Sequence, residues 1–227
     1  MWDDYSCEPP DYGSQEFWEA HFSTAESGSA DDPAALEFEW ICHDLDLIVQ
    51  LIKPYLPEAG RILHPGAGMS LLPLQLQREV PGLQILSLDS SASCTTFMGQ
   101  QHERPGLRWE VGDVTDLCAD GSEWREWLPF NAVVEKGCLD ALLCASDEEA
   151  AKYVKGLSAV LSPDGMCMVV SNTPARRRHL SAVFDILKVV QLHPEDEPFG
   201  PSLYICQRRA ADALDYECVA TAQHEAR

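Results

Sequence analysis

The residues best suited to do chemistry surround a glycine-rich turn at residues 61–70, RILHPGAGMS. The apolar residues before the turn are typical of the end of a buried strand, and Ser70 is positioned to cap a helix that follows. Such a junction directs main-chain N–H groups and the positive end of a helix dipole toward one point. Gly66 and Gly68 leave room for a ligand to approach the backbone, because glycine has no Cβ.

An acidic residue after the next strand indicates the kind of ligand. About 20 residues beyond Gly68, the spacing typical of nucleotide-binding folds, the apolar run ILSLDSS contains Asp89 near its end. A carboxylate there can accept hydrogen bonds from both hydroxyls of a ribose. Leu71 occupies the position of the third glycine of the dinucleotide motif, so a dinucleotide is disfavoured. The pattern predicts a nucleoside ligand, and the alternative is an ordinary strand–helix turn that binds nothing.

Two further strand ends deliver polar residues to the same edge. Asp113 and Val114 follow the strand of residues 106–111, and Glu135 and Lys136 end a short buried strand within residues 130–143. Open parallel sheets bind ligands at the carboxyl ends of their strands. A carboxylate beside a small apolar side chain can flank an adenine ring, although Asp113 is also typical of a turn or helix cap.

Aromatic residues are concentrated before the first core strand. The segment FWEAHF contains Trp18 and Phe22 within about one helical turn, and EFEW ends in Trp40. These rings could cover an adenine or form a docking rim. Packing against the core is an equal alternative, because large aromatic side chains also dominate protein interiors.

The elements that must position these residues alternate between strand and helix. Amphipathic spacing predicts helices over 41–52, 147–161 and 175–187, between strands that include 81–89, 166–172, 188–194 and 202–209. Alternation of this kind requires a parallel sheet covered on both faces. We therefore predict an α/β, Rossmann-like, doubly wound fold with a mostly parallel seven-stranded sheet and an antiparallel C-terminal strand pair. One domain is expected over 16–207, preceded by an acidic flexible arm (1–15) and followed by a tail (208–227).

The charge of the chain restricts its partners. The formal net charge is −21, from 37 acidic and 16 basic residues. Such a field repels nucleic acid and anionic membranes, and it favours a protein partner with a basic, lysine-rich surface. A device for solubility is an equally good explanation of this charge.

The sequence predicts a cytosolic location and no metal site. No apolar run approaches the roughly 20 residues that span a bilayer. The acidic N-terminus resembles neither a secretory signal nor a mitochondrial presequence. Nine cysteines are scattered without CxxC spacing, which predicts reduced thiols in the cytosol.

Several segments together resemble a known family. VVEKGCLDALL (133–143) is similar to a run that is characteristic of one branch of the class I, seven-stranded, S-adenosylmethionine-dependent methyltransferases. That branch includes elongation factor 1A lysine methyltransferase 4. FWEAHF, FEW and the turn GAGMS match further motifs in the same order, so the resemblance covers about residues 16–207.

The resemblance implies a set of cofactor-binding residues. The turn would receive the methionine end of S-adenosylmethionine, Asp89 the ribose, and Asp113 with Val114 the adenine. Carried over position by position, the full set of cofactor-binding residues is Trp18, Phe22, Trp40, Gly66, Gly68, Asp89, Ser90, Asp113, Val114 and Glu135.

The same resemblance implies methyl transfer to a protein lysine. Glu135 is the candidate catalytic residue, for orienting the acceptor, and no general base is assigned. Alternatives are a methyltransferase for a small molecule or another side chain, and a non-catalytic module that binds S-adenosylmethionine. His64, Met69 and Cys138 differ from the residues usual in the branch, which keeps the non-catalytic alternative open.

Overall fold

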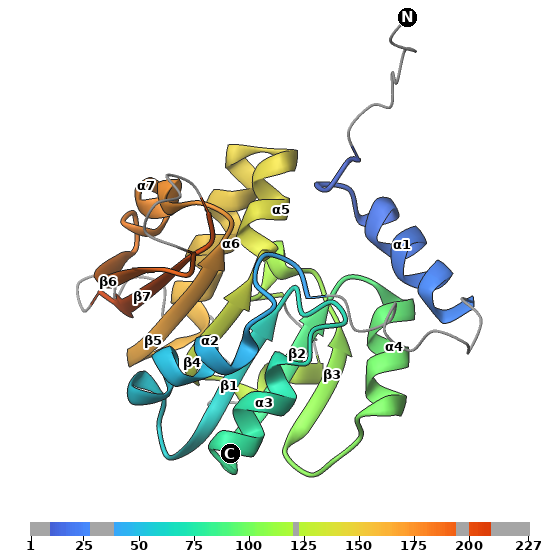
Figure 1. Cartoon of the computed structure of the whole chain (residues 1–227), viewed down its shortest axis with the longest axis horizontal. Helices are drawn as coiled ribbons and strands as arrows, with labels where there is room; N and C mark the ends of the chain where they lie inside the picture. The colour runs from blue at the N-terminus through green and yellow to red at the C-terminus, as the bar shows by residue number, and fades with distance from the viewer. Residues whose placement is uncertain (1–9, 28–38, 120–122, 194–199, 210–227) are drawn as a thin grey trace, which may run out of the picture.

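The structure, a computed structural model, describes residues 10–27, 39–119, 123–193 and 200–209. Its centre is a seven-stranded sheet of order β3-β2-β1-β4-β5-β7-β6 (Figure 1). The strands are β1 (Ala59–Pro65), β2 (Gly82–Asp89), β3 (Leu107–Val111), β4 (Phe130–Lys136), β5 (Leu161–Ser171), β6 (Phe184–Gln191) and β7 (Ser202–Arg208).

The strand directions confirm the predicted fold class. Strands β1 to β5 pair in parallel, whereas β7 is antiparallel to both β5 and β6. The chain reverses its direction along the sheet between β3 and β4, so β1 and β4 are neighbours at the centre. Ligands bind at such a switch point, because the loops on the two sides diverge and leave a crevice.

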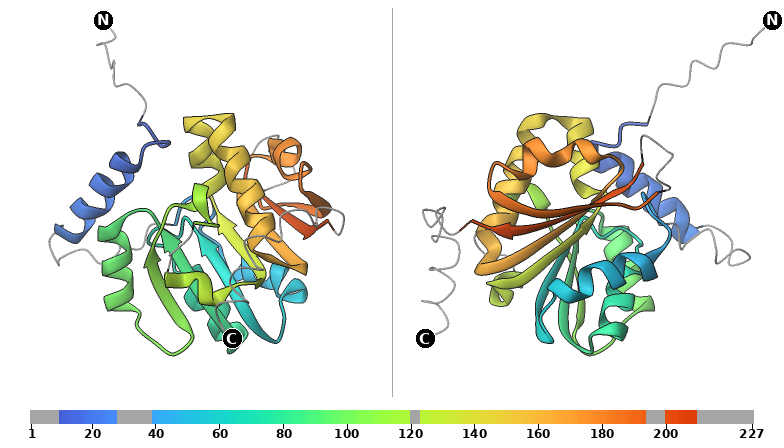
Figure 2. Two further views of the ribbon diagram at one scale, coloured as in Figure 1. Left: turned by 180° about the vertical axis from the view of Figure 1, so that it is seen from behind. Right: turned by 60° about the vertical axis from the view of Figure 1, so that its left-hand side comes forward.

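Helices cover both faces of the sheet. The helices are α1 (Gln15–Ser27), α2 (Leu45–Ile52), α3 (Leu72–Glu79), α4 (Ala92–Gln101), α5 (Cys138–Ala145), α6 (Asp147–Val160) and α7 (Arg177–Leu180). Short 3-10 helices are η2 (Lys53–Tyr55), η3 (Val114–Asp116), η4 (Glu123–Trp127) and η5 (Pro174–Arg176). Figure 1 shows α2 and α3 in front of the sheet and α4 beside β3, and the view from behind in Figure 2 shows α5 and α6 on the other face.

Alternation along the strands assigns side chains to the two faces. Successive residues of a strand point to opposite sides, so Ile62 packs with Ile48 and Leu72 of α2 and α3. Its neighbour Leu63 belongs to the cluster that contains Leu139 and Tyr153 of α5 and α6. These central strands are therefore buried on both sides, which is why their sequences are almost continuously apolar.

Two predictions of secondary structure were wrong. No helix was assigned to residues 138–145, which form α5 directly after Gly137. The predicted helix over 175–187 is instead η5, the single turn of α7, and the beginning of β6 at Phe184. Phe184 is fully buried while Asp185 is exposed, and this alternation lets the segment pair with β7.

Other predictions concern segments near the ends. The described part of the predicted arm ends in a turn that leads into α1, and residues 1–9 lie outside the described residues. Arg208 ends β7, and residues 210–227 of the predicted tail lie outside the described residues. Within the described ranges, no helix is both long and apolar enough to cross a bilayer.

Candidate functional site

A cavity of about 550 Å³ opens at the carboxyl ends of the parallel strands, where the sheet order reverses. This volume lies within the range of about 300–1,000 Å³ typical of small-molecule sites. Nine of the ten residues predicted to bind a cofactor line it: Trp18, Phe22, Trp40, Gly66, Gly68, Asp89, Ser90, Asp113 and Val114. The fold therefore brings together residues that are separated by almost 100 positions in the chain.

The glycine turn forms the floor of this cavity. Gly66 and Gly68 have φ angles of +59° and +50°, which residues other than glycine rarely adopt. The N–H of Ala67 donates to the carbonyl of Leu88 at 3.1 Å and ties the turn to β2. A Cβ on Gly66 would lie 2.5 Å from Sγ of Cys138, so the turn packs directly against the first residue of α5.

We expect Gly66→Ala to lower the free energy of unfolding by about 3 kcal/mol, since a left-handed non-glycine residue costs about 1–2 kcal/mol and overpacking about 1–3 kcal/mol. Urea denaturation would measure this. The matched control is Gly99→Ala in α4, whose added Cβ would meet Cβ of Trp109 at 3.8 Å, an ordinary contact. That control should unfold at an equal or higher urea concentration. Equal stability of the two variants would contradict the prediction.

Asp89 links the turn to the start of α4. Its Oδ2 accepts a hydrogen bond from the N–H of Gly68 at 2.8 Å, and its Oδ1 accepts one from the N–H of Ser91 at 2.9 Å. Burial raises the pKa of Asp89, while these main-chain donors lower it. A carboxylate has about four acceptor positions, so each oxygen can accept a further hydrogen bond from a ligand hydroxyl.

Aromatic rings form one wall of the cavity. Trp18 stacks on Phe22 with ring centroids 5.8 Å apart, and it meets the ring of Trp40 edge-on at 5.4 Å. Tyr12, which the sequence analysis did not identify, contacts Trp40 at 5.8 Å, and its carbonyl accepts from Nε1 of Trp18 at 2.8 Å. The rings thus both line the cavity and pack on each other.

Helix α1 is fastened next to this wall by an acidic side chain. The carboxylate of Glu19 accepts hydrogen bonds from the hydroxyls of Ser91 and Ser93, both at 2.6 Å, at the start of α4. These bonds lower the pKa of Glu19. The attachment brings α1 beside the segment that directly follows Asp89.

Asp113 and Val114 line the cavity just after the end of β3. Oδ1 of Asp113 accepts from the N–H of Thr115 at 2.8 Å, so Asp113 caps η3 as the alternative interpretation expected. Its side chain is nevertheless exposed at the cavity, beside the buried Val114. The helix cap therefore fixes a carboxylate next to an apolar surface.

Glu135 is the one predicted residue that does not line the cavity. It is completely buried, and its Oε2 accepts from the N–H of Leu139 at 3.2 Å in the first turn of α5. Burial and the nearby charge of Asp140 raise the pKa of Glu135 to about 8, so this side chain is mostly protonated at pH 7. Its position joins the end of β4 to the start of α5.

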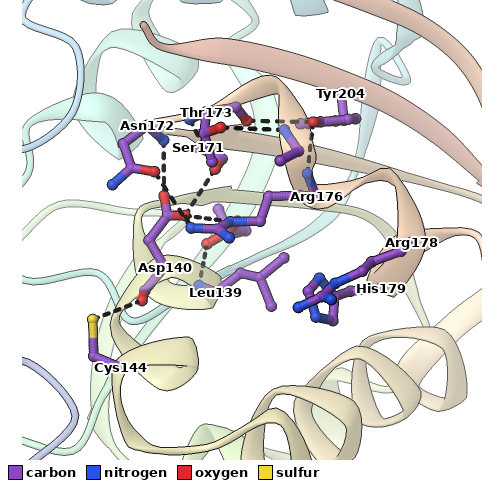
Figure 3. A network of polar contacts seen from close by, with 12 residues as sticks. Leu139, Asp140, Cys144, Ser171, Asn172, Thr173, Arg176, Arg178, His179 and Tyr204 are labelled. Atoms are coloured by element: carbon purple, nitrogen blue, oxygen red, sulfur yellow. Dashed lines mark hydrogen bonds and ion pairs between the residues drawn. The ribbon is translucent and has the colours of Figure 1, made fainter. Parts of the chain in front are cut away.

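Asp140 connects α5 to the segment after β5 (Figure 3). Its Oδ1 accepts from the hydroxyl of Ser171 at 2.8 Å and from Nε of Arg176 at 2.7 Å, and its Oδ2 accepts from the N–H of Asn172 at 2.9 Å. The carboxylate is thus held by an arginine and two further donors. This network forms the wall of the cavity where Asn172 is exposed.

Sequence reasoning missed the α5 side of the cavity. Ala141, Cys144 and Ala145 of α5 line it together with Gly13, whose added Cβ would lie 2.5 Å from the main-chain nitrogen of Ala145. The helical spacing of Leu139, Leu142 and Leu143 after a glycine was the available signal. Within the described residues, all seven cysteines are free thiols and no group of side chains could hold a metal ion.

Comparison with known proteins gives distant relatives. No protein-family model matches the chain. Methyltransferase srdJ of Neurospora crassa is 25% identical over 192 residues, which cover 81% of this chain and 76% of that protein. EEF1A lysine methyltransferase 4 of Bos taurus is 28% identical over 151 residues, covering 66% of this chain. The matched region spans 53% of the bovine protein, about half its length.

Solved structures agree on the fold. The N-methyltransferase NodS from Bradyrhizobium japonicum, solved in complex with S-adenosyl-L-homocysteine, superposes with a TM-score of 0.62 at 14% identity. The match covers 88% of this chain and 99% of NodS. The sheet order and the antiparallel β7 are those of the Rossmann-like fold of class I methyltransferases.

Proposed function

We propose that this protein, folded as a class I methyltransferase, transfers a methyl group from S-adenosylmethionine to the side-chain amine of a lysine in another protein. The observation that supports it most is the cavity itself. Nine residues chosen from sequence motifs meet on its lining, at the sheet edge where this fold binds nucleosides. An accidental resemblance of motifs would not gather them around one crevice.

The cavity suits S-adenosylmethionine in size and in chemistry. Gly68 leaves open the space that a Cβ would occupy, with Phe22 as its nearest neighbour at 3.4 Å. The glycine turn would hold the methionine end, Asp89 and Ser90 the ribose, and Asp113 with Val114 the adenine. When bound, the cofactor supplies an electrophilic methyl group on a sulfonium sulfur.

The chain must hold the acceptor in line and exclude water. A lysine has a pKa near 10.4, so at pH 7 about one molecule in 2,500 is neutral and able to attack. Aromatic and apolar walls favour the neutral amine by desolvation. The rings of Trp18 and Trp40 provide such a wall. Glu135 is mostly protonated at pH 7 and lies outside the cavity lining, and the carboxylate of Asp140 is bonded to Arg176, so neither is proposed as a base.

A protein acceptor is supported by two observations. The bovine relative carries the name of a lysine methyltransferase acting on elongation factor 1A. The net charge of −21 favours a partner with a basic surface, which is where acceptor lysines lie. A small-molecule acceptor is the second candidate, since Methyltransferase srdJ, which is matched over 76% of its length, carries a name that specifies no protein acceptor.

Calorimetry followed by labelling would test the proposal. We expect the protein to bind S-adenosylhomocysteine and then to transfer tritiated methyl groups from S-adenosylmethionine to lysine residues of a protein in cell lysate. Label in a metabolite alone would favour the second candidate. Binding without any labelled product would indicate a non-catalytic module, and failure to bind the nucleoside would refute the methyltransferase assignment.

A further inference from the structure

Three segments that border the cavity converge on one buried ion pair. Nζ of Lys136, at the end of β4, lies 2.8 Å from Oε2 of Glu39, in the segment before α2. The two side chains are 2% and 9% exposed. Neither residue was assigned a binding role from sequence motifs, and Lys136 lines the cavity.

Glu39 also binds the start of α3. Its Oε2 accepts from the hydroxyl of Ser70 at 2.8 Å, and its Oε1 accepts from the N–H of Leu71 at 2.7 Å. The hydroxyl of Ser70 in turn accepts from the N–H of Leu72 at 3.2 Å. The N-cap of α3 is Leu71, without a side-chain hydrogen bond, so the prediction that Ser70 caps this helix was wrong. Glu39 therefore anchors its own segment to the helix that follows the glycine turn.

Lys136 fixes the main chain beside Glu39. Its Nζ donates to the carbonyl of Trp40 at 2.7 Å. The next residue, Ile41, has a φ angle of +71°, which β-branched residues rarely adopt. Ile41 also packs over Gly137, where an added Cβ would lie 3.0 Å from its Cγ1. Lys136 thus holds a strained segment in place.

The segment held in this way presents Trp40 to the cavity. The ring of Trp40 contacts the rings of Trp18 and Tyr12, so its position determines that of the aromatic wall. A buried ion pair is weak evidence for stability, because well-packed apolar residues commonly replace such pairs without loss. Its location, where three cavity-forming segments meet, points instead to positioning.

We propose that the Glu39–Lys136 pair is a positioning device that sets the place of Trp40 in the cavity, and through Trp40 the affinity for S-adenosyl ligands. Neither residue needs to touch the ligand in this role. The inference rests on the proposed function, because it takes the cavity as the site of the S-adenosyl group.

A double-mutant cycle with S-adenosylhomocysteine, measured by calorimetry, tests this. Glu39→Gln with Lys136→Met removes both charges, so no unpaired charge remains buried, while the new amide oxygen can still accept from the N–H of Leu71. We expect this pair variant and Trp40→Ala each to weaken binding about tenfold, which corresponds to losing roughly one good contact. The protein that carries all three substitutions should also bind about tenfold more weakly than wild type, because the ion pair and Trp40 act through the same ring.

The controls separate positioning from general stability. Glu39→Gln alone breaks the ion pair and leaves the charge of Lys136 buried without its partner, so it should also weaken binding about tenfold. Glu79→Ala breaks the exposed pair with Lys53, away from the cavity, and should bind like wild type. Thermal unfolding identifies variants that lose only stability.

Two results would overturn the inference. A combined loss near one hundredfold would mean that the pair and Trp40 act independently. Unchanged affinity of the pair variant, with or without lower thermal stability, would leave the pair a purely structural role. Both results leave the proposed function standing, whereas a wild-type protein that binds no S-adenosylhomocysteine refutes the proposed function and this inference together.

Discussion

Replacing Asp89 by asparagine is expected to weaken the binding of S-adenosylhomocysteine by about a hundredfold, since two hydrogen bonds to a charged group contribute roughly 1.5–3 kcal/mol each and 1.4 kcal/mol is tenfold. In the proposed site these are bonds from the ribose hydroxyls. The main-chain donors add to the effect. Both carboxylate oxygens accept N–H groups, from Gly68 and from Ser91, and an amide would turn its NH₂ group toward one of them.

Calorimetry on Asp89→Asn and on a matched control would check this. Asp46→Asn changes an exposed aspartate that pairs with Arg78, and it should bind like the wild-type protein. Circular dichroism would establish that both variants are folded at the temperature of the titration. Binding by Asp89→Asn within threefold of wild type would contradict the role of Asp89.

Replacing Glu135 by glutamine should stabilise the protein at alkaline pH. The pKa of Glu135 is raised from 4.5 to about 8 by burial. Below pH 4.5 the residue is protonated in both the folded and the unfolded protein, so it adds no pH dependence. As the pH rises from 4.5 to 8, the unfolded chain ionises Glu135 and the folded protein does not, so stability is lost progressively.

The loss expected in the wild-type protein at pH 9 is on the order of 5 kcal/mol, at about 1.4 kcal/mol for each pKa unit. Glutamine does not titrate, and its amide oxygen can accept from the N–H of Leu139 as Glu135 does. Glu135→Gln should therefore match the wild type near pH 5 and exceed it by several kcal/mol at pH 9. Comparing the two at each pH cancels every other titrating group, and a difference independent of pH would contradict the prediction.

The same variant bears on the mechanism. The sequence analysis predicted that Glu135 contacts the cofactor or orients the acceptor. Because the structure buries Glu135 beside α5 and outside the cavity lining, we expect Glu135→Gln to bind S-adenosylhomocysteine within about threefold of wild type at pH 7, a change smaller than one hydrogen bond. Strongly weakened binding in a folded variant would instead support the predicted contact between Glu135 and the cofactor.

The fold followed from local patterns, with two informative exceptions. Apolar strands ending in glycine or acidic residues, alternating with amphipathic helices, were enough to predict the sheet and its antiparallel end. Helix α5 was missed because it begins just after β4, at Cys138, and the apolar run continues through both elements. Phe184 was assigned to a helix because its pairing with Arg208 of β7 depends on a segment more than 20 residues away.

The residues on the cofactor side of the site could be predicted from the sequence because they lie at strand ends, and the ends of parallel strands meet at one edge of the sheet. Gly66, Asp89 and Asp113 each lie at or just after the end of a strand, so the topology alone brings them together. The opposite side depends on contacts between distant segments. Gly13 meets Ala145, and Glu39 meets Lys136, across about 130 and 100 positions of the chain, so these contacts exist only in the tertiary structure.

Glu135 and Lys136 show most clearly what the sequence determines and what only the tertiary structure determines. They are adjacent in the chain at the end of one strand, and the sequence could assign them only to the same edge. Because successive strand residues face opposite sides, Glu135 turns toward α5 and is buried protonated, while Lys136 turns toward Glu39 and the cavity. Residue order therefore specified the strand ends and the ligand class, whereas burial and long-range packing decided which side chain reaches the cavity.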